Sequence, residues 1–253
     1  LKPSTWALVY QQEPVAEDST FTIEAIHGCQ SDRYRGTKPD LERGYIVAGL
    51  DPATSAGFTA SVVMSVDRTT GTRYPIDFFN KRVRASGLRQ LIEDWTERYG
   101  IQEWRIEKNA FQAFLTQDRE INQFLAARGV RLREHHTGLN KRDSDWGVAS
   151  LESLFRGWQD GTALLDLPAM NPNEAYRAFK EQLVTWYPDH PKTQKIDVIM
   201  AFWFAELAAR DAVKDLNSRK QGFLDNPFLS SNDRAGQVVI NIDDWIRDER
   251  QAM

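Results

Sequence analysis

The sequence has almost no cysteine and no long apolar run. Its one cysteine, Cys29, cannot form a disulfide within the chain and excludes a zinc site built on several cysteines. The longest uncharged apolar run, 198–205, is far shorter than the roughly 18 residues that a membrane-spanning helix needs, and the first residues are not typical of a signal peptide. We therefore expect no membrane partner, and we expect any bound metal to have oxygen or histidine ligands.

An excess of positive charge is also missing. The chain has 32 Lys and Arg against 36 Asp and Glu, a net charge of −4, so it is not typical of a protein that coats nucleic acid. No G-x-x-x-x-G-K-[ST] motif is present, which excludes a P-loop ATPase within these residues. The chain begins with Leu in the middle of a pattern, and we expect it to be a piece of a longer polypeptide. Any contact with DNA must come from a local basic patch.

What the sequence does contain is enough apolar surface for a core. Its 253 residues are 41% hydrophobic and include eight Trp and thirteen Phe. Composition divides it into three parts. Residues 1–44 are polar and rich in turn signals, which predicts an arm or linker; 45–215 have regular periodicity, which predicts a folded domain; and 216–253 end in an acidic stretch, which predicts a flexible or partner-binding tail.

Periodicity in the central part predicts an α/β fold. A continuous apolar run at 45–50, an alternating pattern at 58–66 and a run of strand-forming residues at 74–83 predict three antiparallel strands, with a turn at 69–72. Two further strands are expected at 103–107 and 130–136, each after a helix, the first capped by Ser86 and the second running from 111 to 128. Helices are also expected at 148–158, 172–183 and 196–213, with a short strand at 161–167.

Three acids lie at the ends of these elements. Asp51 ends the first strand, Glu107 ends the fourth, and Asp197 begins the last helix. If the first and fourth strands are adjacent and parallel, their acids meet at one edge of the sheet, where open α/β sheets bind ligands. Converging carboxylates repel one another unless cations neutralise them, and oxygen ligands favour Mg²⁺ or Mn²⁺. Two such cations can activate water for phosphodiester cleavage, which predicts a nuclease.

Each acid also has a more ordinary interpretation. Asp51 precedes a proline and could be a turn residue, Glu107 could cap the helix that follows it, and Asp197 could complement a helix dipole. We favour the ligand role for all three because they share this order along the predicted elements.

The segments around these acids are similar to known motifs. Gly49–Ala53, Arg105–Ala110 and Lys195–Ala201 resemble the three acidic motifs in the nuclease domain of tailed-phage large terminases. The resemblance covers about residues 1–215. It implies a ribonuclease H-like fold, in which strands one to three are antiparallel, strands one, four and five are parallel, and helices flank the sheet.

The resemblance also implies a function. It implies an endonuclease that cuts concatemeric double-stranded viral DNA during genome packaging and uses two divalent cations, Mg²⁺ or Mn²⁺, held by Asp51, Glu107 and Asp197. The implied partners are DNA, an ATPase domain in the full-length chain, the small terminase subunit and the portal. The implied location is the host bacterial cytoplasm during virion assembly, and not the mature virion.

The sequence departs from the family at two places. Many relatives have a further acid after the first motif, where this chain has Ala56 to Thr59, and relatives often have His-Asp-Asp at the third motif, where this chain has Lys195-Ile196-Asp197. The identity of a fourth metal ligand therefore stays open. Lys195 could instead contact a phosphate.

A basic stretch follows the second predicted helix. Arg131, Arg133, Lys141 and Arg142 predict phosphate contacts, although such a stretch could also be an ordinary solvated strand and loop. The neighbouring pair His135 and His136 points to opposite faces of the strand, so we expect one of the two to be structural. The remaining expectations are that Phe202 and Trp203 lie in the core, and that Asp77, Asp118 and Glu206 are surface charges.

Two other functions fit parts of the pattern. An actin-like or sugar-kinase-like ATPase half would share the strand order and an acid after the first strand, but it needs a second Gly-rich phosphate hairpin that this sequence lacks. Alternatively, the chain could be a docking module for the portal or capsid that uses residues 221–253 and has lost catalysis.

Overall fold

The computed structural model describes residues 20–31, 44–52, 57–108, 118–137, 147–170, 172–188 and 194–224, with side chains up to 214. The chain divides into two compact units, Leu1–Val213 and Lys214–Met253. The fold described below is that of the first unit. Of the helices in these ranges, none combines the length and the apolar character that crossing a membrane requires.

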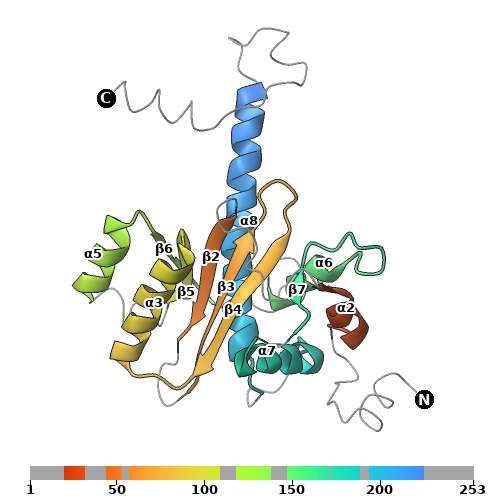
Figure 1. Ribbon diagram of the computed structural model, residues 1–253, viewed down its shortest axis with the longest axis horizontal. Helices are drawn as coiled ribbons and strands as arrows, with labels where there is room; N and C mark the ends of the chain where they lie inside the picture. Colours follow the sequence, from red (N-terminus) through yellow and green to blue (C-terminus); the bar gives the residue numbers. More distant parts are fainter. Residues whose placement is uncertain are drawn as a thin grey trace. The chain divides into compact units, whose positions relative to one another are not determined.

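A five-stranded mixed sheet is the centre of the first unit (Figure 1). Its strands are β2 (Tyr45–Asp51), β3 (Thr59–Val66), β4 (Arg73–Lys81), β5 (Glu103–Glu107) and β6 (Arg131–His135), in the order β4-β3-β2-β5-β6. β2, β3 and β4 are antiparallel, whereas β5 is parallel to β2 and β6 is parallel to β5. The predicted mixed sheet, with adjacent parallel first and fourth strands, is confirmed.

Helices cover both faces of the sheet, and alternation along β2 separates two cores. Ile46, Ala48 and Leu50 pack with α3 (Ala85–Tyr99), β5 and α5 (Arg119–Ala127) on one face. Tyr45 and Val47 pack with α7 (Glu174–Thr185) and α8 (Asp197–Leu224) on the other. Because side chains alternate along a strand, Asp51 shares the α8 face with Val47.

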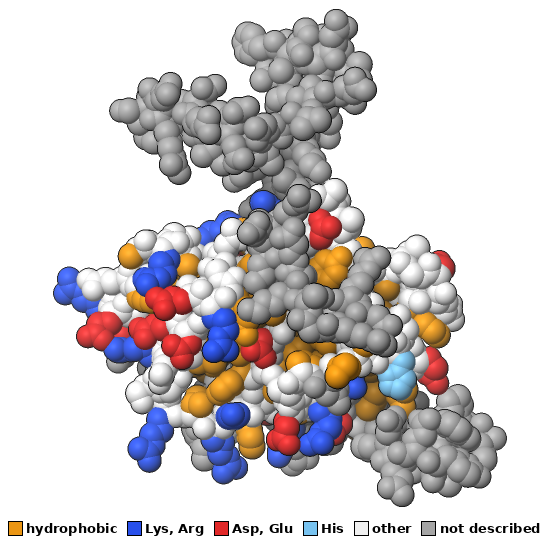
Figure 2. Space-filling model, viewed as in Figure 1, with side chains coloured by type: hydrophobic (Ala, Val, Ile, Leu, Met, Phe, Trp, Pro, Cys, Tyr) orange, Lys and Arg blue, Asp and Glu red, His pale blue; other side chains and the backbone are white. Residues whose placement is uncertain are grey.

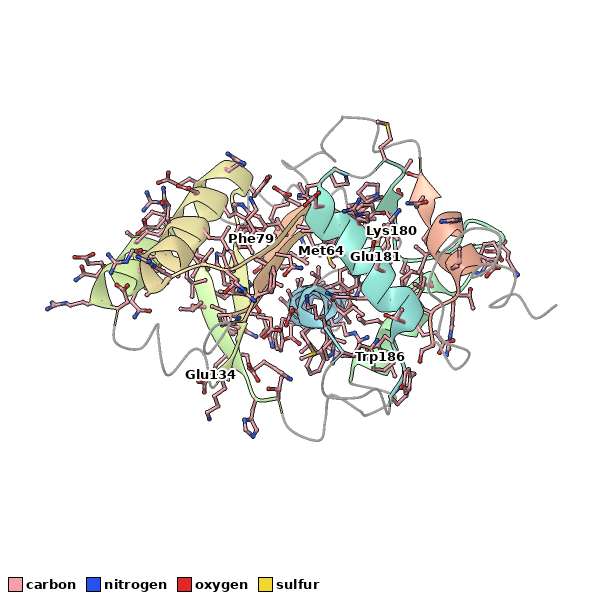
Figure 3. All side chains as sticks on the ribbon, turned by 90° about the horizontal axis from the view of Figure 1, so that it is seen from below. Met64, Phe79, Glu134, Lys180, Glu181 and Trp186 are labelled. Carbon is pink, nitrogen blue, oxygen red and sulfur yellow. The ribbon has the colours of Figure 1, made fainter. Side chains whose placement is uncertain are left out.

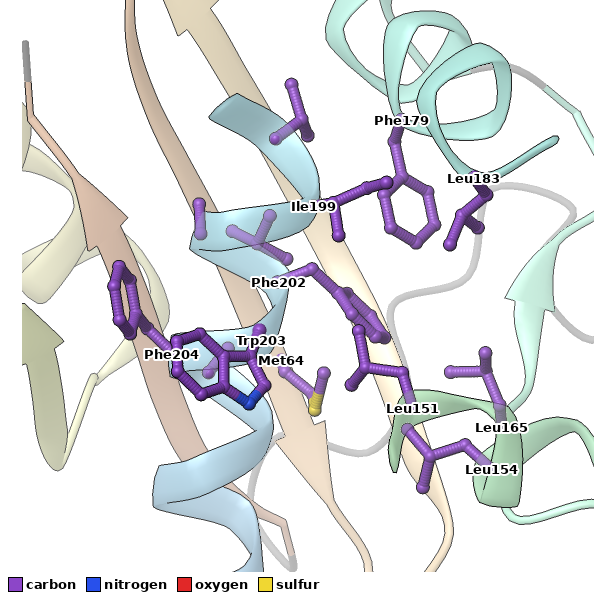
Figure 4. Packing of buried hydrophobic residues seen from close by; sticks show 14 of the residues in the cluster. Met64, Leu151, Leu154, Leu165, Phe179, Leu183, Ile199, Phe202, Trp203 and Phe204 are labelled. Atoms are coloured by element: carbon purple, nitrogen blue, oxygen red, sulfur yellow. The ribbon is translucent and has the colours of Figure 1, made fainter. Parts of the chain in front are cut away.

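Helix α8 lies against the sheet, and residues 198–209 of it are buried in the second core. Phe202 and Trp203 are 0% and 1% exposed, which confirms their predicted place in the core. The ring of Phe202 lies 4.8 Å from that of Phe179 on α7 (Figure 4). In the view from below, α8 is seen end-on between the sheet and α7 (Figure 3).

The helix boundaries follow local capping chemistry, with small corrections. α3 ends at Gly100, which adopts a left-handed conformation, but its N-cap is Arg84 rather than the predicted Ser86. α5 begins after Asp118, whose side chain accepts a hydrogen bond from the backbone N–H of Ile121. α7 begins two residues later than predicted because the Asn173 side chain caps it.

Two predicted elements are shorter in the structure. The helix expected at 148–158 consists of a 3₁₀ turn, η4 (Val148–Leu151), and one α-helical turn, α6 (Glu152–Phe155). The chain leaves the helix at Gly157, which has a φ of 81°. The strand expected at 161–167 is reduced to β7 (Leu167–Pro168) and an isolated bridge between Leu165 and Arg73.

Part of the predicted arm packs on the core. Residues 20–31 contain α2 (Ile23–Gly28) and β1 (Gln30–Ser31), and β1 pairs in parallel with β7. Phe21 is 2% exposed, with its ring 5.7 Å from that of Trp186. The predicted boundaries at 44/45 and 215/216 stay predictions.

The prediction that Glu206 is a surface charge is wrong. Glu206 is 0% exposed on α8, and its carboxylate accepts hydrogen bonds from Arg73 at 2.9 and 3.1 Å and from Arg210 at 2.9 Å. A buried carboxylate is tolerable only with such partners, and Arg73 lies too far away in sequence for a local pattern to reveal it. Asp118 caps α5 and pairs with Arg89, and Asp77 accepts hydrogen bonds from Tyr99 and Asn173.

Candidate functional site

The parallel pairing of three strands places two of the predicted acids side by side. β2 pairs with β5 in the register Gly49↔Arg105 and Leu50↔Ile106, so Asp51 and Glu107 follow at the same level on neighbouring strands. Glu107 pairs in turn with His135 of β6. Asp51, Glu107 and His135 therefore form one row at the carboxyl edge of the parallel strands, the edge where open α/β sheets bind ligands.

This row faces α8. Arg105, two residues before Glu107 and on the same face of β5, donates a hydrogen bond of 2.7 Å to Asp211 of α8. The ring of His135 lies 5.0 Å from that of Trp203 in an edge-to-face arrangement. The α8 side of the sheet edge is thus the side to which Asp197 could contribute.

A glycine brings the start of α8 to the same edge. A Cβ atom at Gly49 would lie 2.0 Å from the carbonyl oxygen of Ala201 and 2.4 Å from the amide nitrogen of Ala205, so only glycine permits this approach of helix and strand. Asp197 is one helical turn before Ala201, roughly 6 Å along the axis. Asp51 is two residues after Gly49, roughly 7 Å along β2.

α8 runs antiparallel to β2. Asp197, which precedes Ala201 on the helix, and Asp51, which follows Gly49 on the strand, are therefore displaced in the same direction from the contact at Gly49. Glu206 shows this direction, because it lies after Ala205 on α8 and pairs with Arg73, which is at the Tyr45 end of the sheet. The backbone therefore brings the levels of Asp51, Glu107 and Asp197 together at one edge.

The electrostatic setting differs among the three acids. All three are partly buried. Burial holds the pKa of Asp197 above its usual range, and the nearby charge of Lys195 opposes this shift. The carboxylate of Glu107 accepts a hydrogen bond from the hydroxyl of Thr137, a contact that the sequence did not predict. Thr137 lies two residues after His135, just past the end of β6.

His135 is the structural member of the histidine pair. Burial is the main reason that its pKa is lowered, with smaller contributions from the charges of Arg105 and His136. It is half-buried against Trp203 and Phe204, whereas His136 is exposed. The expectation that one of the two histidines is structural is confirmed by this packing.

The donor chemistry of this edge suits a hard divalent cation, because it offers carboxylate oxygens on partly buried side chains. Within the ranges that the structure describes, however, no three His, Cys, Asp or Glu side chains form a group that could hold a metal ion. The backbone brings the three acids to one edge without gathering their side chains. Their metal-ligand roles, and the number of cations, stay predictions.

The predicted DNA-binding residues fall into three groups. Lys195 is exposed near Asp197, and its ammonium lies 5.2 Å from the ring centre of Phe58. Arg131 and Arg133 are both 3.7 Å from the carboxylate of Glu103, and Arg133 is also 3.4 Å from Asp211. Lys141 and Arg142 lie outside the described residues.

These ion pairs give the arginines of β6 a structural role. Arg131 pairs with Glu103 at the beginning of β5, four residues and roughly 13 Å from the level of Glu107. Glu103 is 1% exposed and needs compensating positive charge. A structural role therefore accounts for part of the positive charge of β6, and phosphate binding by Arg131 and Arg133 stays a prediction.

Comparison with known proteins gives matches only at the level of structure. No family model matches the sequence, and no curated protein sequence matches it. The chain is similar to the large terminase nuclease domain of phage P22, with a TM-score of 0.49 and 16% identity over 78% of this chain and 96% of that one.

Two further structures are similar to the chain over comparable lengths. The large terminase nuclease of thermophilic phage G20c with bound magnesium has a TM-score of 0.48 and 15% identity, over 75% of this chain and 97% of that one. The large terminase nuclease domain of bacteriophage SPP1 with bound Mn has a TM-score of 0.46 and 18% identity, over 70% and 93%. The matches also include a human cytomegalovirus terminase nuclease domain and RuvC of Thermus thermophilus.

Proposed function

We propose that this chain is a metal-dependent endonuclease that cleaves double-stranded DNA. The observation that carries the proposal is the register of β2 and β5, which puts Asp51 and Glu107 at the same level on adjacent parallel strands. The close contact at Gly49 supports it, because this contact brings the first turn of α8, and with it Asp197, to the same edge. The three motifs that resemble those of terminase nucleases coincide with these three positions.

Each acid has a role in this proposal. Asp51 would hold both cations, and Glu107 and Asp197 would complete their ligand sets. When bound, divalent cations supply Lewis-acid stabilisation of the charge that develops during phosphodiester hydrolysis. Thr137 orients the Glu107 carboxylate by its hydrogen bond. Burial of Asp197 disfavours an uncompensated negative charge there, so a cation at this position would relieve an existing cost.

The biological role is part of the same proposal. By resemblance of its three motifs, the chain would act as the nuclease domain of a phage large terminase that cuts concatemeric DNA during genome packaging. An ATPase domain in the full-length chain, the small terminase subunit and the portal would be its partners, and the host bacterial cytoplasm its location.

Plasmid nicking tests the proposal. Supercoiled plasmid is incubated with the wild-type chain in Mn²⁺ or Mg²⁺, and conversion to nicked and linear forms is followed on a gel. We expect cleavage that EDTA abolishes and that Asp51→Asn reduces by at least about a hundredfold, because a neutral amide is a poor ligand for a hard cation.

The matched control is Asp94→Asn, the same change at an exposed position on α3. Its cleavage rate should equal that of the wild type, and circular dichroism should show that both variants are folded. Wild-type cleavage by folded Asp51→Asn would refute the assignment of Asp51, and absence of metal-dependent cleavage by the wild-type chain would count against the proposed function.

A further inference from the structure

Exposed positive side chains gather at the same sheet edge as the acids, on the side of β4. β4 ends at Lys81, and Arg82 and Arg84 follow it directly; all three are exposed. Lys81 pairs with Thr59, next to the pair Ala60↔Asp51, so β4 ends at the carboxyl edge of β2. Two strand spacings, roughly 10 Å, separate β4 from β2.

An aromatic ring connects the end of β4 with the start of α8. The guanidinium of Arg82 lies 5.3 Å from the ring centre of Phe58, and the ammonium of Lys195 lies 5.2 Å from it. Phe58 precedes β3 and is partly exposed. Cations at such distances from a ring are held by its negative face, so one ring positions two cations from segments that are far apart in sequence. Lys and Arg side chains are visible along the lower rim in Figure 2, where β4 ends in Figure 1.

The charges at this edge lack the compensation found elsewhere. Among the described residues, Lys81, Arg82 and Arg84 have no ion pair with an acid, and Lys195 has none within ion-pair distance, although its charge acts on Asp197. In contrast, the arginines of the β5 and β6 strands are held by Glu103 and Asp211 at distances of 2.7 to 3.7 Å. Cations without acidic partners attract solution counterions, and binding of a polyanion such as DNA releases the counterions that its own charge has condensed.

We propose that these cations, together with Phe58, form a phosphate-binding rim, made of Phe58, Lys81, Arg82, Arg84 and Lys195, that holds the backbone of duplex DNA on the β4 side of the acids. This inference rests on the proposed function and extends it. Lys and Arg charges bind the phosphate oxygens that every duplex presents, whatever its sequence. The rim therefore positions the duplex without selecting a sequence. The β6 strand contributes less than its composition suggests, because Arg131 and Arg133 share Glu103, and Arg133 also pairs with Asp211, so part of their charge is compensated.

The salt dependence of DNA binding tests the rim. Fluorescence anisotropy measures the Kd of the full chain for a short labelled duplex in EDTA, between about 50 and 200 mM salt. Each lost phosphate contact lowers the slope of log Kd against log salt by about 1. We expect this decrease for Arg82→Gln and for Lys195→Gln, and about twice the decrease for the double variant.

Arg68→Gln is the matched control. Arg68 is also exposed and stacked on a ring, 5.6 Å from the centre of Tyr45, but it lies in the turn after β3, at the opposite end of the sheet. Its slope should equal that of the wild type. Thermal melting of every variant shows whether the fold is retained.

The outcomes separate the rim from the proposed function. If the wild-type chain cleaves DNA and Arg82→Gln and Lys195→Gln keep the wild-type slope, the rim is refuted and the nuclease stands. If the wild-type chain binds duplex DNA and the slopes fall as expected, the rim is supported even where no cleavage occurs. Equal losses for Arg68→Gln and Arg82→Gln, or no binding by the wild-type chain, would refute the rim.

Discussion

Replacing Gly49 by alanine is the sharpest test of how the site is assembled. The added methyl group would lie 2.0 Å from the Ala201 oxygen and 2.4 Å from the Ala205 nitrogen, both backbone atoms that no rotamer change can move away. To restore ordinary contact, α8 has to move away from β2 by about 1.4 Å. This shift loosens the core beneath α8 and displaces Asp197 from the level of Asp51.

The expected cost follows from overpacking a rigid contact. Inserting a methyl group into a packed core costs about 1–3 kcal/mol, and the two backbone clashes put Gly49→Ala at the upper end, about 3 kcal/mol. For a domain of this size, that lowers Tm by roughly 6–12 °C. Differential scanning calorimetry measures the shift, and plasmid nicking at a temperature where the variant is folded measures the loss of activity.

Gly87→Ala provides the control. Gly87 lies inside α3, where a Cβ atom would meet its nearest neighbour, Val83, at 3.4 Å, which is ordinary contact. Alanine is favoured over glycine within a helix by up to about 1 kcal/mol, so this variant should be as stable as the wild type or more stable. A Tm for Gly49→Ala within about 2 °C of the wild-type value would refute the reasoning from close approach.

Three further predictions concern buried ionisable groups. Glu206→Gln leaves the buried charge of Arg73 uncompensated, so it should lower the free energy of unfolding by about 3–5 kcal/mol, measured by urea denaturation. The control Glu152→Gln breaks an exposed ion pair and should lower the free energy of unfolding by under about 1 kcal/mol. Burial raises the pKa of Cys29 to about 11, so Ellman's reagent at pH 8 should react slowly with the folded chain and rapidly in guanidinium; equal rates would contradict the burial. Because the pKa of Asp197 is raised, the folded state binds the proton of this carboxyl more tightly than the unfolded state does. Protonation of Asp197 therefore stabilises the fold fully below the ordinary Asp pKa, and this stabilisation is lost as pH rises through the raised pKa. In EDTA, Asp197→Asn should therefore melt above the wild type at pH 7 and with it near about pH 3, below the ordinary Asp pKa, and a variant less stable at pH 7 would contradict this sign.

Local patterns were sufficient for most of the sheet and for the level of the acids. The strand at Glu103–Glu107 has the predicted bounds, and the meander of β2, β3 and β4 follows from period-two alternation and a short turn. Adjacency of the first and fourth strands was sufficient to predict that Asp51 and Glu107 meet at one edge. The run Lys81, Arg82, Arg84 was visible in the sequence as well, but its significance depends on which edge of the sheet it occupies.

Other features could not be predicted because their partners are distant in sequence. The partner of Glu206 is 133 residues away at Arg73, and the ring beside Lys195 belongs to Phe58. The prediction of one helix at 148–158 was wrong, because an apolar pattern of helical period also fits a 3₁₀ turn that packs on a core.

The sequence by itself determined the type and order of the elements, since hydrophobic period, caps and turns act over a few neighbouring residues. It also determined which strand and helix ends have acids. Tertiary structure alone decided which basic side chains have an acidic partner. The pairing of Arg133 with Glu103, the absence of an acidic partner for Arg82 among the described residues, and the contact that Gly49 permits with α8 all depend on how distant segments pack. Charge compensation and close packing act through space, so only the folded chain shows which side chains have partners.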